Sequence, residues 1–396
     1  MAENKPGNES RKLGVVFGGS GLIGGTIVNY FKTKRPGIVD MRAPSSKKVS
    51  LKDCTDIRNY LMSIKPDFVI NAAITNIDSD PQLSFEVNYA GALNVARAAA
   101  ALKIPYIFFS SAATLPSGEN LKEEDHRPLT AQLSNYAKSK LMAESTLTYM
   151  AEHEGLDFSC IRLGIVYGNH DHKIQGFHRL LFSVADESMP FMFTRKDTMH
   201  SYSNSRKLPY LIHHMLDNRP EFTGKTYHFV DKDPVELARL ILTIKSHLVL
   251  KSPREIYIPY PLARTGKNSV RVILRLLTKI GLKASLPPEL MFLNAFYRTQ
   301  TLSSARLQAS SFIDPLPDET VFTRLPEMVI YYLNRWSHQN LITTFDEKIE
   351  AEADKTVEEM FTNDPQSLLD DIHGNATSPF RESNVHPKIF EEIRKQ

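Results

Sequence analysis

The chain has 396 residues, of which 42% are hydrophobic, enough for one large α/β domain or a domain with an appended lobe. Its 48 basic and 45 acidic residues nearly balance, which argues against a nucleic-acid-binding or membrane-surface protein. Two cysteines, Cys54 and Cys160, exclude a disulfide framework and a cysteine-built zinc site, and we expect both in the core of a cytoplasmic protein. Because the first ten residues are polar, we expect no targeting signal, and we expect no integral membrane segment because no apolar run is long enough.

The charge is unevenly distributed along the chain. Residues 341–396 carry 13 acidic and 6 basic side chains, so the rest of the chain is basic. A basic body suits an anionic ligand, although scattered solvated lysines explain it equally simply.

The first half of the chain alternates short apolar runs with helical patterns, which is typical of βαβ units and a parallel sheet. We expect residues 1–12 to be disordered and residues 13–168 to form a doubly wound α/β (Rossmann) domain. The expected strands are residues 13–18, 37–41, 49–54, 67–74, 105–113 and 157–168. The expected helices between them are residues 22–34, 55–66, 81–103 and 134–154.

The pattern loosens after residue 168, where we expect a smaller mixed α/β substrate lobe over residues 169–340, interwoven with the sheet. Its expected helices are residues 173–187, 205–218, 234–248 and 269–282, its expected strands are 190–193, 199–203 and 224–231, and residues 254–264 are expected to be extended. The basic amphipathic helix at 269–282 fits an ordinary lobe helix, a membrane-docking helix or a cover over a hydrophobic substrate. Residues 341–396 read as an acidic tail, helical and then coiled or disordered.

A glycine-rich turn links the first strand to the first helix. Gly18, Gly21 and Gly24 follow the spacing G-x-x-G-x-x-G, which lets backbone amides, including those of Leu22 and Ile23, approach a pyrophosphate at a helix N-terminus. The alternative is a tight turn with close helix packing, and Gly19 and Gly25 are expected to be merely permissive.

An acidic residue follows the second strand, sixteen residues after the last motif glycine. Asp40 is placed to accept hydrogen bonds from the adenosine ribose hydroxyls of NAD and to repel the 2′-phosphate of NADP. The nearby Arg42 could instead bind that phosphate. NAD is therefore favoured, and NADP remains the alternative.

Tyr136 and Lys140 are four residues apart on an expected helix and therefore share one face. A cation near a phenol lowers its pKa, which suits a general acid or base acting on a hydroxyl or carbonyl. Ser110 and Ser111 end a buried strand at the edge where open α/β sheets bind ligands. By itself each feature also fits an ordinary surface or a strand cap.

Taken together, these pieces resemble the extended short-chain dehydrogenase/reductases of the NAD-dependent epimerase/dehydratase type. The matching segments, in order, are "GGSGLIGG", "KDCTD", "VINAAI", "VNYAGALNVARAA", "FFSSAA", "YAKSK" and "IRLGIVYG". The resemblance implies that Tyr136 is the catalytic acid/base, that Lys140 lowers its pKa and binds the nicotinamide ribose, and that Ser111 polarises the substrate oxygen.

The same resemblance implies the remaining cofactor contacts. Asp53, with Cys54 beside it, would hold the adenine, the segment from Asn71 through Ala72 and Ala73 would line the cofactor, and Asn88 would steady the site from its helix. Ser111 is preferred to Ser110 and Thr114 because Ala112, a small residue, follows it.

Departures from the family pattern lie near the cofactor and substrate loops. Phe17 replaces a threonine, Leu163 and Gly164 stand where proline commonly follows the arginine, and Asn169 replaces a second proline. His170 and His172 flank Asp171, but we find no convergent ligands and expect no bound metal.

We therefore expect an NAD(P)-dependent oxidoreductase or epimerase/dehydratase that transfers hydride at a carbinol or ketone carbon of a small molecule, first of all a sugar nucleotide. One alternative is a hydroxysteroid or lipid-alcohol dehydrogenase of the same family. Another is a catalytically silent NAD(H)-binding module that recruits a protein partner. The resemblance also allows a homodimer.

Overall fold

The computed structural model describes residues 11–186, 191–248, 257–279, 293–339, 341 and 355–373. The chain divides into two compact units, Met1–Val329 and Ile330–Gln396. Of the N-terminal segment expected to be disordered, residues 1–10 lie outside the described residues, and Lys12 already belongs to the first strand.

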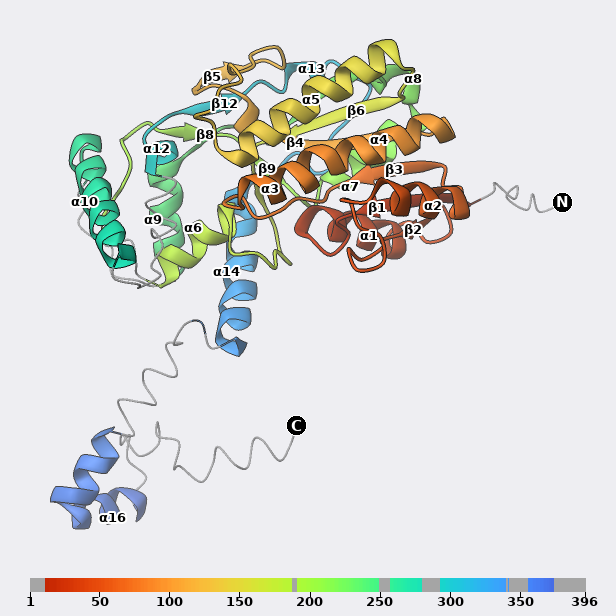
Figure 1. The fold of residues 1–396 in the computed structure, drawn as a ribbon. Helices are drawn as coiled ribbons and strands as arrows, with labels where there is room; N and C mark the ends of the chain where they lie inside the picture. Colours follow the sequence, from red (N-terminus) through yellow and green to blue (C-terminus); the bar gives the residue numbers. More distant parts are fainter. Residues whose placement is uncertain are drawn as a thin grey trace, which may run out of the picture. The chain divides into compact units, whose positions relative to one another are not determined.

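The main sheet of the first unit has six parallel strands in the order β10-β6-β4-β3-β1-β2 (Figure 1). The chain crosses over between β2 and β3 to the other side of β1, so β1 lies at a switch point where open α/β sheets bind ligands. These strands are β1 (Lys12–Phe17), β2 (Val39–Arg42), β3 (Phe68–Asn71), β4 (Tyr106–Ser111), β6 (Phe158–Leu163) and β10 (Lys225–Phe229). The doubly wound fold expected from the sequence is confirmed.

Helices cover both faces of this sheet because its strands are apolar on both sides. One core joins Val15 and Phe108 of the strands to Ile57, Ala96 and Leu147, which belong to α2 (Cys54–Ile64), α4 (Gly91–Leu102) and α5 (Asn135–His153). The opposite core joins the alternate strand residues to α1 (Leu22–Thr33) and α7 (Leu208–Asp217). Figure 1 shows α4 and α5 running side by side over the strands.

A second, mixed sheet has the order β11-β8-β12-β5, and a two-stranded sheet pairs β7 with β9. The added strands are β5 (Gly118–Leu121), β7 (Ile165–Tyr167), β8 (Met199–His200), β9 (Tyr202–Asn204), β11 (Val235–Glu236) and β12 (Gln300–Leu302). The remaining helices of this unit are α3 (Pro81–Leu83), η1 (Ser84–Ala90), η2 (Ala112–Thr114), α6 (Gly176–Ala185), α8 (Arg219–Phe222), α9 (Leu237–His247), α10 (Tyr260–Lys279), α12 (Leu293–Phe296) and α13 (Ala305–Gln308). α6, α9, α10 and α12 gather at one end of the unit, at the left in Figure 1.

Helix α14 (Val321–His338) crosses from the first unit into the second. In the second unit, residues 355–363 are helical and α16 (Pro365–His373) follows. No helix within the described residues is long and apolar enough to span a membrane.

Several expected elements differ in the structure. Residues 49–54 form no strand; instead the Asp53 carboxylate caps α2 by accepting hydrogen bonds from the amides of Thr55 and Asp56. The expected strand at 157–168 breaks at Gly164 into β6 and β7. The strand expected in the lobe at 224–231 instead joins the main sheet as β10, beside β6.

Two further expectations need correction. The extended segment expected at 254–264 is helical from Tyr260 onward, while residues 254–256 lie outside the described residues. Cys160 is buried as expected, but Cys54 is exposed, because it occupies the first position of α2, whose buried face is formed by Ile57 and Leu61.

Candidate active site

The glycine turn after β1 brings three backbone segments into close contact. Gly18 has a φ of +83°, and a Cβ there would lie 2.6 Å from the amide nitrogen of Ala73. A Cβ on Gly24 would lie 2.3 Å from the carbonyl oxygen of Gly18. These two glycines are therefore required by the packing of the turn against α1 and β3, as the alternative interpretation of the motif held.

The other glycines of the motif divide differently from the sequence-based expectation. A Cβ on Gly21 would meet only the Gly18 oxygen, at 3.4 Å, and Gly21 is exposed, so its lack of a side chain leaves room for a ligand. Gly19, expected to be permissive, is tightly packed, because a Cβ there would lie 2.5 Å from that of Ala43.

The N-terminus of α1 fits a pyrophosphate. Gly21 caps this helix without any side-chain hydrogen bond, so the amides of Leu22, Ile23 and Gly24 in the first turn have no side-chain acceptor at the cap. Amides at a helix N-terminus attract an anion. An anion would reach them through the open space over Gly21, which we call the cradle.

The segment after β3 forms one wall beside the turn. Asn71 is buried and accepts a hydrogen bond from the amide of Ala73 at 3.1 Å, while its amide group donates to the Tyr106 hydroxyl. The Ala72 amide donates to the Phe17 carbonyl. The side chain of Asn71 therefore shapes the loop, and the backbone of Ala72 and Ala73 lies next to the turn.

Asn88 lies in the π-helix η1 and is almost completely buried. Its side chain accepts a hydrogen bond from the Thr75 amide and donates to the Thr75 hydroxyl, each at 2.9 Å. It thus holds the loop that follows Ala73; that this steadies the active site, as the resemblance implies, stays a prediction.

The two acidic residues assigned to the adenosine differ in their surroundings. Asp40 ends in a partly exposed carboxylate that pairs with Arg42 at 2.8 Å and with Arg11 at 4.0 Å. One carboxylate oxygen of Asp53 accepts the two hydrogen bonds that cap α2. The sequence suggests that Arg42 could bind the 2′-phosphate of NADP. In the structure Arg42 already forms an ion pair with Asp40.

The proposed catalytic side chains converge at the end of β4. Ser111 is the last residue of β4 and Tyr136 lies in the first turn of α5, and the Ser111 hydroxyl acts on the pKa of Tyr136. The hydroxyl of Ser110 is buried without a hydrogen-bond partner in the described part of the chain. Thr114 donates instead to the Ser111 carbonyl, so Ser111 is the hydroxyl that faces Tyr136.

Lys140 lies one turn further along α5 and is 1% exposed. Its Nζ donates to the Phe109 carbonyl at 2.7 Å and lies 4.5 Å from the centre of the Phe108 ring. The ammonium group is therefore held at the carboxyl end of β4, in the same region as Ser111.

The pKa values differ from the expectation for an activated phenol. Burial raises the pKa of Tyr136, and its hydrogen bond to Ser111 opposes that rise. Burial lowers the pKa of Lys140 to about 8. The net shift of the phenol pKa is therefore upward, opposite to the lowering expected from the sequence.

The departures after β6 have a physical reason. A Cβ on Gly164 would lie 2.3 Å from the carbonyl oxygen of Ser201, so the chain crosses too closely for the usual proline. Asn169 donates a hydrogen bond to Glu327 at 2.6 Å, which ties this loop to the second turn of α14. Among the described residues no cluster of three potential metal ligands occurs, at His170 and His172 or elsewhere.

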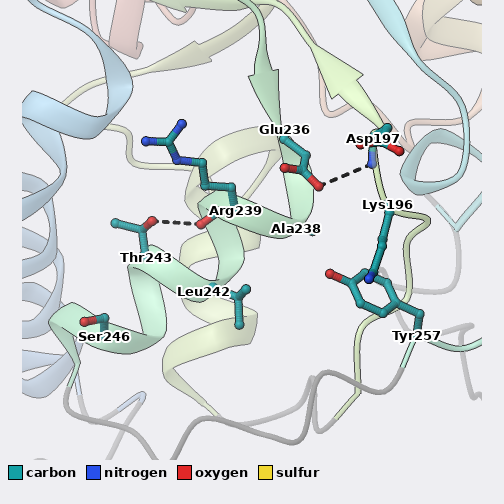
Figure 2. A pocket seen from close by; sticks show the side chains of 9 residues that line it. All are labelled: Lys196, Asp197, Glu236, Ala238, Arg239, Leu242, Thr243, Ser246 and Tyr257. Atoms are coloured by element: carbon teal, nitrogen blue, oxygen red, sulfur yellow. Dashed lines mark hydrogen bonds between the residues drawn. The ribbon is translucent and has the colours of Figure 1, made fainter.

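A separate hollow of about 540 Å³ lies along α9 (Figure 2), and no candidate site residue lines it. Its wall carries Lys196 over the Tyr257 ring and the Glu236 carboxylate, which accepts a hydrogen bond from the Asp197 amide. Two cations and two carboxylates balance there, so the hollow shows no charge preference.

Sequence reasoning missed a buried charged network behind Lys140, made of Glu144, Arg162 and His228. Two signals could have found it: Glu144 continues the four-residue spacing of Tyr136 and Lys140, and Arg162 interrupts the apolar strand "FSCIRL".

The chain belongs to the NAD dependent epimerase/dehydratase family, whose model matches residues 15–223. UDP-glucose 4-epimerase from Thermus thermophilus, solved with NAD, is 17% identical, with a TM-score of 0.58 over 81% of this chain and 99% of that one. dTDP-4-dehydrorhamnose reductase from Bacillus anthracis, solved with NADP, is 15% identical, with a TM-score of 0.58 over 82% and 99%. dTDP-glucose 4,6-dehydratase from the same organism, in complex with NAD, is 12% identical, with a TM-score of 0.61 over 82% and 97%.

These likenesses confirm the Rossmann fold. Comparison with curated proteins gives no match.

Proposed function

We propose that this chain is an NAD-dependent enzyme that transfers hydride at a carbinol or ketone carbon of a sugar nucleotide. The observation that carries the proposal is the grouping of Ser111, Tyr136 and Lys140 at the edge of the sheet that also carries the uncapped N-terminus of α1. Family membership supports the cofactor class, and the solved sugar-nucleotide enzymes that share this fold support the substrate class.

The residues divide the work between binding and proton transfer. The first-turn amides of α1 would bind the pyrophosphate, with Gly21 leaving space for it. Asp40 would accept hydrogen bonds from the ribose hydroxyls. We favour NAD over NADP because Asp40 already pairs with Arg42, which reduces the positive charge available to a 2′-phosphate.

Tyr136 would take the proton from the substrate hydroxyl in the direction of oxidation and return it in reduction. Ser111, whose hydroxyl acts on the pKa of Tyr136, would hold the same oxygen and orient it. Lys140 would present its two remaining N–H groups to the nicotinamide ribose, since one is fixed by the Phe109 carbonyl. The bound nicotinamide supplies the hydride acceptor or donor.

The test compares wild-type protein with Tyr136→Phe, which removes one hydroxyl and keeps the ring. NADH binding is followed by fluorescence, and turnover of a panel of UDP-, dTDP- and GDP-sugars is followed by product analysis. We expect turnover to fall by at least about a hundredfold while NADH affinity stays within about twofold of wild type. Equal turnover by the two proteins would refute the role of Tyr136.

A further inference from the structure

Glu144 continues the face of α5 that carries the proposed catalytic pair. Tyr136, Lys140 and Glu144 follow one another at four-residue intervals, which places them on one side of the helix. Glu144 is 3% exposed and Lys140 is 1% exposed. A buried carboxylate is costly in free energy unless it is paired and hydrogen-bonded.

Arg162 of β6 binds this carboxylate with two hydrogen bonds. Its Nε donates to Oε1 of Glu144 at 3.1 Å, and its Nη2 donates to Oε2 at 2.7 Å. Arg162 is 1% exposed. The pair joins the middle of α5 to the strand adjacent to β4, whose end carries Ser111.

His228 of β10 orients Arg162 from the other side. Nη1 of Arg162 lies 2.9 Å from Nε2 of His228, and Nδ1 of His228 lies 3.1 Å from the Ser303 carbonyl. Because an arginine only donates, Nε2 accepts and Nδ1 carries the proton. Burial and the charge of Arg162 lower the pKa of His228 to about 3, so the imidazole stays neutral.

The titratable groups around Lys140 come from three places. Tyr136 and Glu144 share its helix, and Cys160 and Arg162 lie on β6. His126, from the loop after β5, reaches within 3.8 Å of the Glu144 carboxylate.

Glu123 belongs to the same network but lies beyond Arg162. Its backbone carbonyl accepts a hydrogen bond from Nη1 of Arg162, and its carboxylate accepts one from the His228 amide and lies 3.8 Å from Arg306. The carboxylate of Glu123 is therefore engaged away from Lys140.

This arrangement buries two cations, Lys140 and Arg162, with one carboxylate, which pairs with Arg162 and lies one helical turn beyond Lys140. Burial is the largest influence on the pKa of Lys140 and lowers it, while Cys160 and then Glu144 act to raise it. Without the carboxylate, the guanidinium of Arg162 would stand as an unpaired positive charge behind the ammonium group.

We propose that Glu144 is a positioning residue for Lys140: its pairing with Arg162, which His228 orients, neutralises the buried guanidinium and keeps Lys140 protonated and in place for the cofactor ribose. The proposal rests on the function proposed above, in which Lys140 binds that ribose. Its chemistry is electrostatic, and no bond is made or broken.

The experiment measures the titration of Lys140 in the cofactor-free protein by NMR of ¹⁵N-labelled lysine, with Lys140→Arg to assign the signal. In Glu144→Gln, which keeps the shape and removes the charge, we expect Lys140 to titrate about one pH unit lower or more. NADH affinity at neutral pH should fall and recover at lower pH. An unchanged titration would overturn the proposal.

Glu123→Gln is the matched control, because it removes a buried carboxylate from the same network without being a neighbour of Lys140. We expect Lys140 to titrate there as in wild type, even if the protein melts at a lower temperature. An equal displacement in both variants would show a general loss of structure and overturn the proposal.

Two further variants keep the test decisive if Glu144→Gln does not fold. Glu144→Asp retains the charge, so Lys140 should titrate as in wild type. Glu144→Gln/Arg162→Gln removes both charges, so the titration should return toward that of wild type. A low titration in either protein would contradict neutralisation as the role of Glu144.

The two proposals fail in different ways. If wild-type protein does not bind NADH, the proposed function fails, although the titration of Lys140 still reports on Glu144. If NADH binds and Glu144→Gln leaves Lys140 unchanged, the proposed function stands and the positioning role falls.

Discussion

Our first prediction concerns Gly24, at which α1 packs closely against the glycine turn. In Gly24→Ala the added Cβ would lie 2.3 Å from the Gly18 oxygen, 2.8 Å from the Gly18 carbonyl carbon and 2.9 Å from the Gly19 Cα. All three are backbone atoms, so α1 and the turn must separate by about 1 Å to restore ordinary contact. Such overpacking costs about 1–3 kcal/mol, against a gain of about 1 kcal/mol from replacing a helical glycine.

Gly25→Ala is the matched control, since it lies in the same turn of the same helix. Its Cβ would lie 3.3 Å from the Gly19 oxygen, so the helix-propensity gain of about 1 kcal/mol is largely kept. Urea unfolding followed by circular dichroism should rank Gly25→Ala about 2 kcal/mol above Gly24→Ala in free energy of unfolding. Equal stability of the two variants would refute the close-packing role of Gly24.

Two further predictions concern charge. Asp40→Asn should weaken NADH binding by about tenfold, since hydrogen bonds to a charged acceptor are worth about 1.5–3 kcal/mol, and should leave NADPH binding less affected; an unchanged NADH-to-NADPH affinity ratio would contradict the assignment. Burial raises the pKa of Asp231 to about 6, although Tyr167 donates a hydrogen bond to it at 2.7 Å. The protonated form is therefore favoured in the folded state, and the associated stability is complete at low pH and is lost as pH rises through about 6. The free energy of unfolding of Asp231→Asn, relative to that of wild type, should therefore increase by about 2 kcal/mol between pH 4 and pH 7. Unfolding of both proteins at both pH values measures this increase. A difference that stays constant with pH would contradict the raised pKa of Asp231.

The parallel sheet was predictable because its strands have a distinctive composition. Runs such as "FVIN" and "YIFFSS" are apolar on both faces and are separated by helical patterns, so they fit only a covered parallel sheet. The segment 49–54 misled because Val49 and Leu51 alternate with polar residues as in a strand. In the structure both side chains are buried, and Asp53 caps the next helix. A helix cap depends on local backbone geometry, which the alternation of apolar and polar residues does not reveal.

The sequence predicts the placement of the candidate catalytic residues better than their electrostatics; their catalytic roles stay predictions. The spacing of Tyr136 and Lys140 correctly placed them on one face of α5. The pKa of Tyr136 could not be predicted, because it depends chiefly on how deeply the phenol is buried. The pairing of Glu144 with Arg162 also joins residues from different elements, and no local pattern encodes it.

The glycine motif shows the same limit within one short segment. Spacing alone could not separate glycines needed for packing from the one that leaves room for a ligand. The contacts assign Gly18, Gly19 and Gly24 to packing and Gly21 to the open cradle. The phosphate-binding and tight-turn interpretations of the motif are therefore compatible, since different glycines serve each.

A crystal structure of the protein with NAD tests the central claim most directly. We predict the pyrophosphate over the first-turn amides of α1, the adenosine ribose at Asp40, and the nicotinamide ribose within hydrogen-bond distance of Lys140, with the ring beside Tyr136. NAD bound elsewhere, or bound with its nicotinamide remote from Tyr136, would contradict the account.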